Sequence, residues 1–243
     1  MRIIGDYHTH TIYSHGTGTI RDNVKVAIKK GLKEIAICDH GPGHRLYGIH
    51  KEDIIKMREE IDRLNEEYKD INILLGIEAN IMDYKGTIDL DKDDIAIIDI
   101  LLLGYHYGIV PENPKDMLMF YFLNPASKVL PFLKNKMETL NTNAMIQAII
   151  KYPIDIITHP SSKARVNIKK IAEVAYENNT ALEINSNHSQ LSVENIKIAL
   201  KSKVEFYINS DAHNPSKVGD FEKGIQRALQ TKIPVHRIKN AEN

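Results

Sequence analysis

Apolar residues follow two alternating patterns along the chain: short β-branched runs, and longer segments with apolar residues at helical spacing. The short runs predict seven strands, at Ile3–Ile4, 34–38, 72–77, 99–103, 154–158, 181–184 and 204–209. The helical spacing predicts helices at 21–30, 54–68, 143–151, 168–177, 193–201 and 217–230. Strands that alternate with helices form parallel sheets, because parallel neighbours need a crossover connection. The pattern therefore predicts an α/β fold.

The predicted parallel sheet can close into a barrel or stay open as a doubly wound sheet. A dinucleotide-binding sheet carries Gly-x-Gly-x-x-Gly at its first turn, and this chain has no such motif there. In a βα barrel, the chemistry lies at the carboxyl ends of the strands. Histidine or acidic residues stand at that position after six of the seven predicted strands. We therefore expect a TIM-like barrel, which would bring these residues into one ring, in a single domain over 1–243.

One segment, 107–142, interrupts the alternation of strands and helices. It holds four prolines and the apolar run 117–123, and it is too long for a simple connection. Three roles fit such a segment: a lid over a pocket, an association surface or a locally packed excursion. We favour the locally packed excursion and leave homo-oligomer formation open.

Composition restricts the classes of protein that this chain can belong to. The chain has 243 residues, 42% of them hydrophobic, which suits one large domain or two small ones. No apolar run reaches the roughly 18 residues of a transmembrane helix, and no signal region precedes Asp6. The single cysteine, Cys38, excludes an intramolecular disulfide and fits the reducing cytoplasm. The net charge of zero argues against a dedicated nucleic-acid binder.

Histidine is the unusual component, with eleven residues, and its placement predicts a metal centre. His8 and His10 alternate along a strand, so both imidazoles can face one point. With the first loop included, seven histidines and two carboxylates form the candidate ligand set: His8, His10, His15, His40, Glu78, His106, His159, Asp211 and His213. Nine ligands exceed the needs of one tetrahedral ion, so we expect two or three ions, with Glu78 as the bridge. Zinc, manganese and iron all suit such ligands.

Closely spaced ions suit the hydrolysis of phosphate esters. They lower the pKa of a bound water and neutralise charge on the phosphoryl oxygens. The chain has no P-loop, no Gly-x-Ser-x-Gly elbow and no cysteine in a nucleophile's context. We therefore expect the nucleophile to be a metal-bound hydroxide and no side chain to serve as nucleophile.

The motifs at the strand ends resemble those of the PHP (polymerase and histidinol phosphatase) family, above all its free-standing phosphoesterases. The similar segments run in family order along nearly the whole chain. They are Asp6-Tyr7-His8-Thr9-His10-Thr11, Cys38-Asp39-His40-Gly41-Pro42, Gly76-Ile77-Glu78-Ala79-Asn80, Gly104-Tyr105-His106, Thr158-His159-Pro160, Leu182-Glu183-Ile184-Asn185 and Asn209-Ser210-Asp211-Ala212-His213. The enlarged 107–142 segment departs from the family pattern.

The resemblance implies a distorted seven-stranded (β/α)7 barrel with a trinuclear metal centre. It implies three ligand sets, with Glu78 shared by two of them. One ion would take His8, His10, Glu78 and Asp211; a second would take Glu78, His106 and His159; a third would take His15, His40 and His213.

Several polar residues near these motifs have two interpretations each. Asp6 and Asp39 precede candidate ligands and would either orient imidazoles or stabilise turns. Arg45, Lys163 and Arg165 follow strands on the presumed active face and are candidate phosphate-binding residues, with Arg165 first. We expect four further histidines to be ordinary, His44, His50 and His188 in loops and His236 in the tail. Cys38 is expected to be a small core residue.

The leading functional hypothesis is a metal-dependent phosphatase that acts on small phosphomonoesters. Two alternatives use the same site: a 3′ nuclease and a histidinol-phosphate phosphatase. An amidohydrolase also begins with His-x-His, but it predicts eight strands and often a bridging carboxylated lysine. A non-catalytic metal-binding module would be expected to have lost ligands, whereas all nine positions are filled here.

Overall fold

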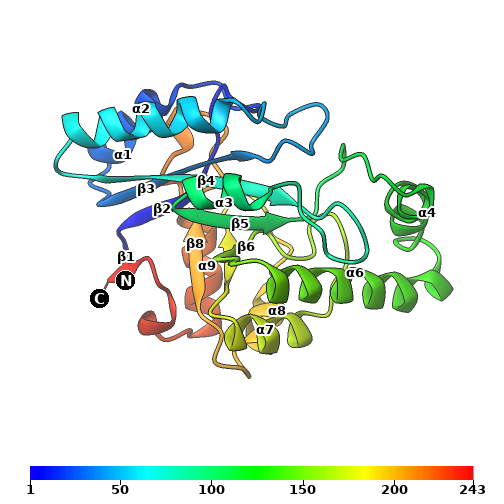
Figure 1. Ribbon diagram of the computed structural model, residues 1–243. Helices are drawn as coiled ribbons and strands as arrows, with labels where there is room; N and C mark the ends of the chain where they lie inside the picture. Colours follow the sequence, from blue (N-terminus) through cyan, green and yellow to red (C-terminus); the bar gives the residue numbers. More distant parts are fainter. Residues whose placement is uncertain (243) are drawn as a thin grey trace.

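A seven-stranded parallel sheet forms the centre of the protein, in a computed structural model that describes residues 1–242. The strands pair in sequence order (Figure 1). They are β2 (Gly5–Thr9), β3 (Glu34–His40), β4 (Asn72–Asn80), β5 (Ile100–Gly104), β6 (Ile156–Ile157), β7 (Ala181–Asn185) and β8 (Phe206–Asn209). A parallel bridge between Thr9 and Ala212 joins the first strand to the chain just beyond the last. The sheet is therefore a nearly closed, distorted barrel, as predicted.

Helices cover the outside of the barrel (Figure 1). They are α1 (Ile20–Lys29), α2 (Asp53–Glu67), α3 (Lys92–Ile97), α6 (Pro131–Lys151), α7 (Ile168–Glu177), α8 (Val193–Ala199) and α9 (Glu222–Thr231). A capping box between Thr19 and Asp22 starts α1, and its apolar face buries Val24 and Ala27. The helix α3 was not predicted. A second capping box, between Asp91 and Asp94, stabilises its first turn.

The barrel interior changes character along its axis. Ala36 and Cys38 belong to a small cluster of buried hydrophobic residues on the strands. His40 follows them on the same face of β3. Gly76 stands opposite Cys38, where an added Cβ would lie only 2.4 Å from the Cys38 Sγ atom. Mostly apolar residues, small ones in β3 together with Ile100, Leu102 and Ile156, therefore fill the barrel below the site, and chemically active residues stand at the carboxyl end. The prediction that Cys38 is a small core residue is confirmed.

The two ends of the chain differ from the prediction. The first barrel strand is β2, not Ile3–Ile4; the preceding β1 (Arg2–Ile3) pairs antiparallel with β9 (Ala241–Glu242). The predicted helix 217–230 begins later, at Glu222, after a 3-10 turn (Pro215–Lys217). Gly219, with φ of +71°, turns the chain between these two elements.

The 107–142 segment contains three short helical pieces and half of a long helix. The pieces are α4 (Pro114–Leu118), a π-helix (Met119–Leu123) and α5 (Asn124–Ala126). Helix α6 starts at Pro131 and not at 143, because proline at the first helical position suits a helix start. Phe120 packs against the rings of Tyr84 and Tyr105, so the segment rests on the barrel. Within residues 1–242, no helix is long and apolar enough to cross a membrane.

Candidate metal centre

Histidine and carboxylate side chains converge at the carboxyl end of the barrel. The Nε2 atoms of His8 and His10 lie 3.1 Å apart. Both nitrogens face Glu78 Oε2, at 3.4 Å from His8 and 3.7 Å from His10. Asp211 Oδ1 lies 3.7 Å from the His8 nitrogen and 3.4 Å from that of His10. These four side chains therefore surround one point, as the sequence analysis expects for the first ion.

Glu78 also faces three further imidazoles. Its Oε1 atom lies 3.2 Å from His106 Nε2 and 3.0 Å from His159 Nε2. Its Oε2 atom lies 2.9 Å from His40 Nδ1. The two carboxylate oxygens thus face different groups of nitrogens, which is the geometry that a bridging ligand needs.

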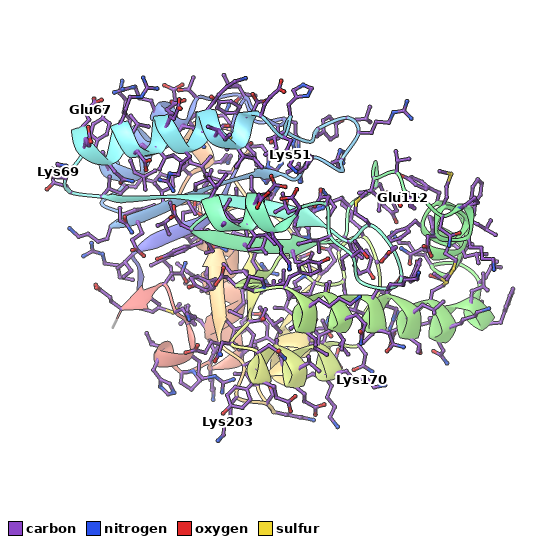
Figure 2. All side chains as sticks on the ribbon, in the orientation of Figure 1. Lys51, Glu67, Lys69, Glu112, Lys170 and Lys203 are labelled. Carbon is purple, nitrogen blue, oxygen red and sulfur yellow. The ribbon has the colours of Figure 1, made fainter. Side chains whose placement is uncertain are left out.

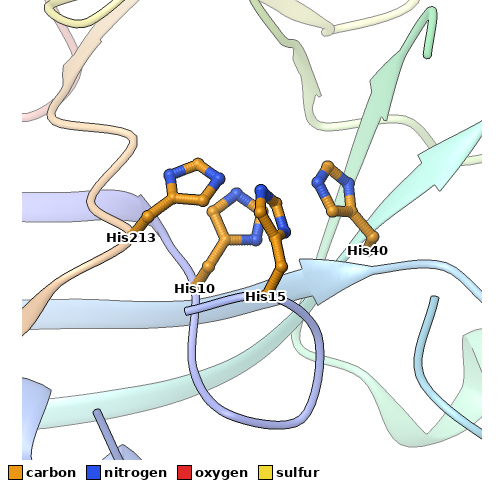
Figure 3. Close-up of side chains that lie close together, drawn as sticks. All are labelled: His10, His15, His40 and His213. Atoms are coloured by element: carbon orange, nitrogen blue, oxygen red, sulfur yellow. The ribbon is translucent and has the colours of Figure 1, made fainter. Parts of the chain in front are cut away.

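A third group of imidazoles stands beside the first (Figure 3). The ring of His15, from the loop after β2, stacks on His40 at 4.8 Å between centroids. The His213 ring lies 4.1 Å from His15 and 4.3 Å from His10. Nitrogens of all four side chains lie within 4.8 Å of one another. The structure therefore brings together all nine ligands predicted from the sequence.

The chemistry of Glu78 tests whether this donor set suits cations. The side chain is fully buried, and neither carboxylate oxygen has a hydrogen-bond partner in residues 1–242. A buried ionised carboxylate without donors costs several kcal/mol, so such groups are paired or coordinate metals. Two nitrogens that face Glu78, His40 Nδ1 and His106 Nε2, are likewise buried without a hydrogen-bond partner among the described residues. The residues fit bound divalent cations.

The electrostatics of the site separate the histidines into two kinds. Burial lowers the pKa of His106 to about 3 and that of His10 well below its ordinary value, so both imidazoles are neutral at pH 7. Burial also opposes charge on His8, but Glu183, Glu78 and Asp211 outweigh it and raise the pKa of His8 well above the usual value. Burial would likewise raise the pKa of Glu78, yet the surrounding imidazoles lower it overall.

Backbone conformation at two candidate ligands is unusual. His159 has φ of 24° and Asp211 has φ of 55°, in the left-handed region that non-glycine residues seldom adopt. Such positions cluster at functional sites, where the surrounding structure holds them. The Glu183 carboxylate supports His159 here, by accepting a 2.7 Å hydrogen bond from its backbone N–H.

Two orienting groups were not predicted in that role. Glu183 Oε1 lies 2.7 Å from His8 Nδ1, and Asn80 Oδ1 lies 2.7 Å from His106 Nδ1. Asn80 in turn donates to the buried carboxylate of Asp89. Glu183 belongs to one of the motifs named above. Its position as a carboxylate inside an apolar predicted strand was the sequence signal that could have identified its role. Asp89 lies in a connection, and only the fold brings it to Asn80.

The predicted orienting residues Asp6 and Asp39 hold loops and do not bond to imidazoles. Asp6 accepts hydrogen bonds from the backbone N–H groups of Ser210 and Gly219. Asp39 accepts from the backbone and hydroxyl of Thr11 and from the Ser14 hydroxyl. The turn-stabilising alternative therefore holds, and each carboxylate fixes a loop that carries a candidate ligand.

Two histidines expected to be ordinary lie at the site. His44 is buried, with its ring stacked 5.3 Å from that of His40, so its assignment as a solvated loop residue was wrong. His188 Nε2 lies 3.5 Å from Asp211 Oδ2, and its ring is 5.0 Å from His159. The backbone N–H of His188 donates to Asn185 Oδ1, which turns the loop after β7 toward the centre. His50 is exposed, as expected.

The three candidate phosphate-binding residues do not all lie at one place. Arg45 is exposed, and its backbone N–H donates to Gly108. Lys163 and Arg165 line a cleft beside the centre, and Arg165 Nε lies 2.6 Å from Glu138 Oε2.

Comparisons with known proteins agree with this geometry. The family model for the PHP domain matches residues 6–187. A "probable phosphatase" of Shewanella frigidimarina is 32% identical over 250 residues, which cover 99% of this chain and 90% of that protein. The DNA polymerase/3′-5′ exonuclease PolX of Bacillus subtilis is 30% identical over 252 residues. This match covers the whole chain but only 40% of the length of PolX.

A solved structure shares the fold at low sequence identity. It is a histidinol phosphate phosphatase from Lactococcus lactis, in complex with zinc, L-histidinol and phosphate. The TM-score is 0.60 at 16% identity, over 94% of this chain and 92% of that one. At this identity the likeness supports the barrel fold alone.

Proposed function

The chain belongs to the PHP domain family, and on that premise we propose that it is a metal-dependent phosphatase that hydrolyses small phosphomonoesters. One observation carries the proposal: the buried Glu78 carboxylate has no hydrogen-bond partner within residues 1–242 and faces imidazoles from four strand ends. Bound divalent zinc, manganese or iron ions would lower the pKa of water and neutralise phosphoryl oxygens at such a centre.

The ligand sets are part of this proposal. His8, His10 and Asp211 would hold one ion with Glu78, and His106 and His159 would hold a second with the other Glu78 oxygen. His15, His40 and His213 would hold a third. The distances between their donor atoms support these sets, with two additions: His40 also groups with Glu78 and His106, and His10 also groups with His15, His40 and His213. His40 is therefore placed to serve either of the last two ions.

The remaining residues would position these ligands. Glu183 orients His8 and holds the backbone of His159, and Asn80 orients His106. Asp6 and Asp39 anchor the loops that present Asp211 and His15. Because these contacts are buried, the imidazoles cannot rotate away freely, and substrate phosphate meets a preorganised site.

A direct test is hydrolysis of p-nitrophenyl phosphate by the metal-loaded protein, before and after treatment with a chelator. We expect turnover that the chelator abolishes and that added zinc or manganese restores. Glu78→Gln should reduce kcat/KM by about 100-fold or more while circular dichroism stays unchanged. Failure of the metal-loaded protein to hydrolyse any phosphoester in a broad panel would exclude the proposal.

Nuclease action is the second candidate, because the similarity to PolX spans the whole chain. The net charge of zero favours a small substrate over a nucleic acid. Comparison of p-nitrophenyl phosphate, histidinol phosphate and a single-stranded oligonucleotide with a 3′-hydroxyl end distinguishes the alternatives, because only a nuclease cleaves the phosphodiester bonds of the last. The seven-stranded barrel disfavours an amidohydrolase. We also propose a cytoplasmic location, which the buried unpaired thiol of Cys38 supports.

A further inference from the structure

A large cleft lies beside the metal centre and contains none of its candidate ligands. Its volume is about 840 Å³, within the range of small-molecule sites. Its walls come from the loop after β6, the start of α7, the end of α8 and the segment 124–138. We call it the basic cleft, because six cationic side chains line it: Lys128, Lys134, Lys163, Arg165, Lys169 and Lys201.

The charge of the basic cleft contrasts with that of the chain. Glu138 is its only acidic lining residue, and it pairs with Arg165 at 2.6 Å. The chain as a whole has a net charge of zero, so cations have been concentrated at this one place. A concave surface lined by one sign of charge raises the local concentration of ligands of the opposite sign.

The basic cleft opens next to the candidate metal centre. Ser161, in its wall, is two residues beyond His159, and Gln190 is two residues beyond His188. His188, two residues before Gln190, places its Nε2 atom 3.5 Å from Asp211 Oδ2 at the candidate metal centre. The wall of the cleft therefore begins close to two side chains of the centre.

Three partly buried hydrogen bonds hold the wall formed by the loop after β6 in place. The Tyr107 hydroxyl donates to the Lys163 carbonyl at 3.0 Å, and Asn141 Nδ2 donates to the Arg165 carbonyl at 3.0 Å. The Asn167 N–H donates to Thr142 Oγ1 at 2.8 Å. The enlarged segment 107–142 supplies all three partners, so it shapes the cleft beside the barrel.

The lining also indicates what kind of anion fits. Its apolar members are aliphatic, Val166, Ile168 and Ile198, and no aromatic side chain belongs to it. Proteins that bind single-stranded nucleic acid stack bases on aromatic rings in addition to using positive charge. The lining therefore favours phosphate groups on a small, non-aromatic molecule over a nucleic-acid strand.

We propose that the basic cleft binds a second phosphate group of the substrate, so that the preferred substrate is a small bisphosphate whose other phosphate is hydrolysed at the metal centre. This inference rests on the proposed phosphatase function. It assigns the 107–142 segment a role in substrate selection, since three of its hydrogen bonds hold the wall formed by the loop after β6.

The test compares fructose 6-phosphate with fructose 1,6-bisphosphate as substrates of the metal-loaded protein. Lys169→Ala/Lys201→Ala removes two cations from the cleft. Lys170→Ala/Lys203→Ala is the matched control, because both lysines are exposed, neighbour the same helices and lie outside the lining. Figure 2 shows both control residues at the periphery of the molecule. We expect the wild-type kcat/KM ratio of bisphosphate to monophosphate to exceed tenfold, and to fall about tenfold only in the cleft variant.

Calorimetric titration with fructose 1,6-bisphosphate separates failure of this inference from failure of the proposed function. Weaker binding by the cleft variant alone supports the cleft even if no substrate is hydrolysed. Equal ratios and equal binding in the two variants would overturn the inference while hydrolysis continues. A second result would also overturn the inference: the wild-type protein prefers a 3′-phosphorylated oligothymidylate, and the cleft variant loses that preference. That result would assign the cleft to a nucleic-acid strand.

Discussion

Glu183 and His8 form a fully buried pair across the barrel, with Oε1 2.7 Å from Nδ1. The bond leaves the other ring nitrogen of His8 facing Glu78 and Asp211. Carboxylates that hold the far nitrogen of a metal-binding histidine set its tautomer and raise its basicity. Glu183 is therefore as much a part of the site as the ligands, although 175 positions separate it from His8.

Glu183→Gln should weaken metal binding with little change in the fold. The amide keeps the shape of the side chain but loses the charge that favours a hydrogen bond from His8. We expect about 10- to 100-fold lower affinity for zinc, measured by competition with a chromophoric chelator. Glu177→Gln, on the exposed end of α7, is the control and should match wild type. Unchanged affinity in Glu183→Gln would contradict the assigned role.

Asp89→Ala should act on His106 through Asn80. The Asp89 carboxylate accepts hydrogen bonds from the backbone and side chain of Asn80, whose oxygen faces His106 Nδ1. Removing it leaves buried donors unpaired, at a cost of about 1–3 kcal/mol in unfolding free energy. Urea denaturation of the metal-free protein measures this cost. Asp93→Ala removes an exposed carboxylate on nearby α3, and equal losses in both variants would exclude the relay.

Removal of bound metal should lower the stability of the protein. Ligands that bind only the folded chain add about 2.7 kcal/mol when present at 100 times their dissociation constant. Here several ions would also neutralise the buried Glu78 and Asp211 carboxylates. We expect a chelator to lower the calorimetric Tm by several degrees, and zinc to restore it. Identical melting curves with and without chelator would show that no ion binds to this centre.

Metal binding at pH 7 should release protons. Burial opposes charge on His8 and His159, but neighbouring carboxylates raise the pKa of each above its ordinary value, so the metal-free protein is more protonated there than free imidazole would be. An ion needs neutral imidazole, so these protons must leave and apparent affinity should rise with pH. Zinc titration calorimetry in two buffers of different ionisation enthalpy counts the protons. Equal heats in both buffers would contradict the raised pKa values.

The predicted positions of strands and helices came from local patterns, and most of them hold in the structure. The errors lie where distant contacts decide the outcome. Arg2–Ile3 pairs with Ala241–Glu242, a partner that no local window contains. The helix α6 begins twelve residues before its predicted start, at Pro131 rather than 143, because its buried face includes Met137 and Asn141.

The sequence by itself determined the nine candidate ligands, because barrel topology places every strand end at one rim and the ligand types are recognisable in the chain. Only the tertiary structure decided which residues support them. Glu183, Asp89 and His188 acquire their roles through contacts across 9 to 175 positions or through loop direction, which no spacing rule encodes. The basic cleft is also a tertiary feature, since its cations come from four separate segments of a chain with no net charge.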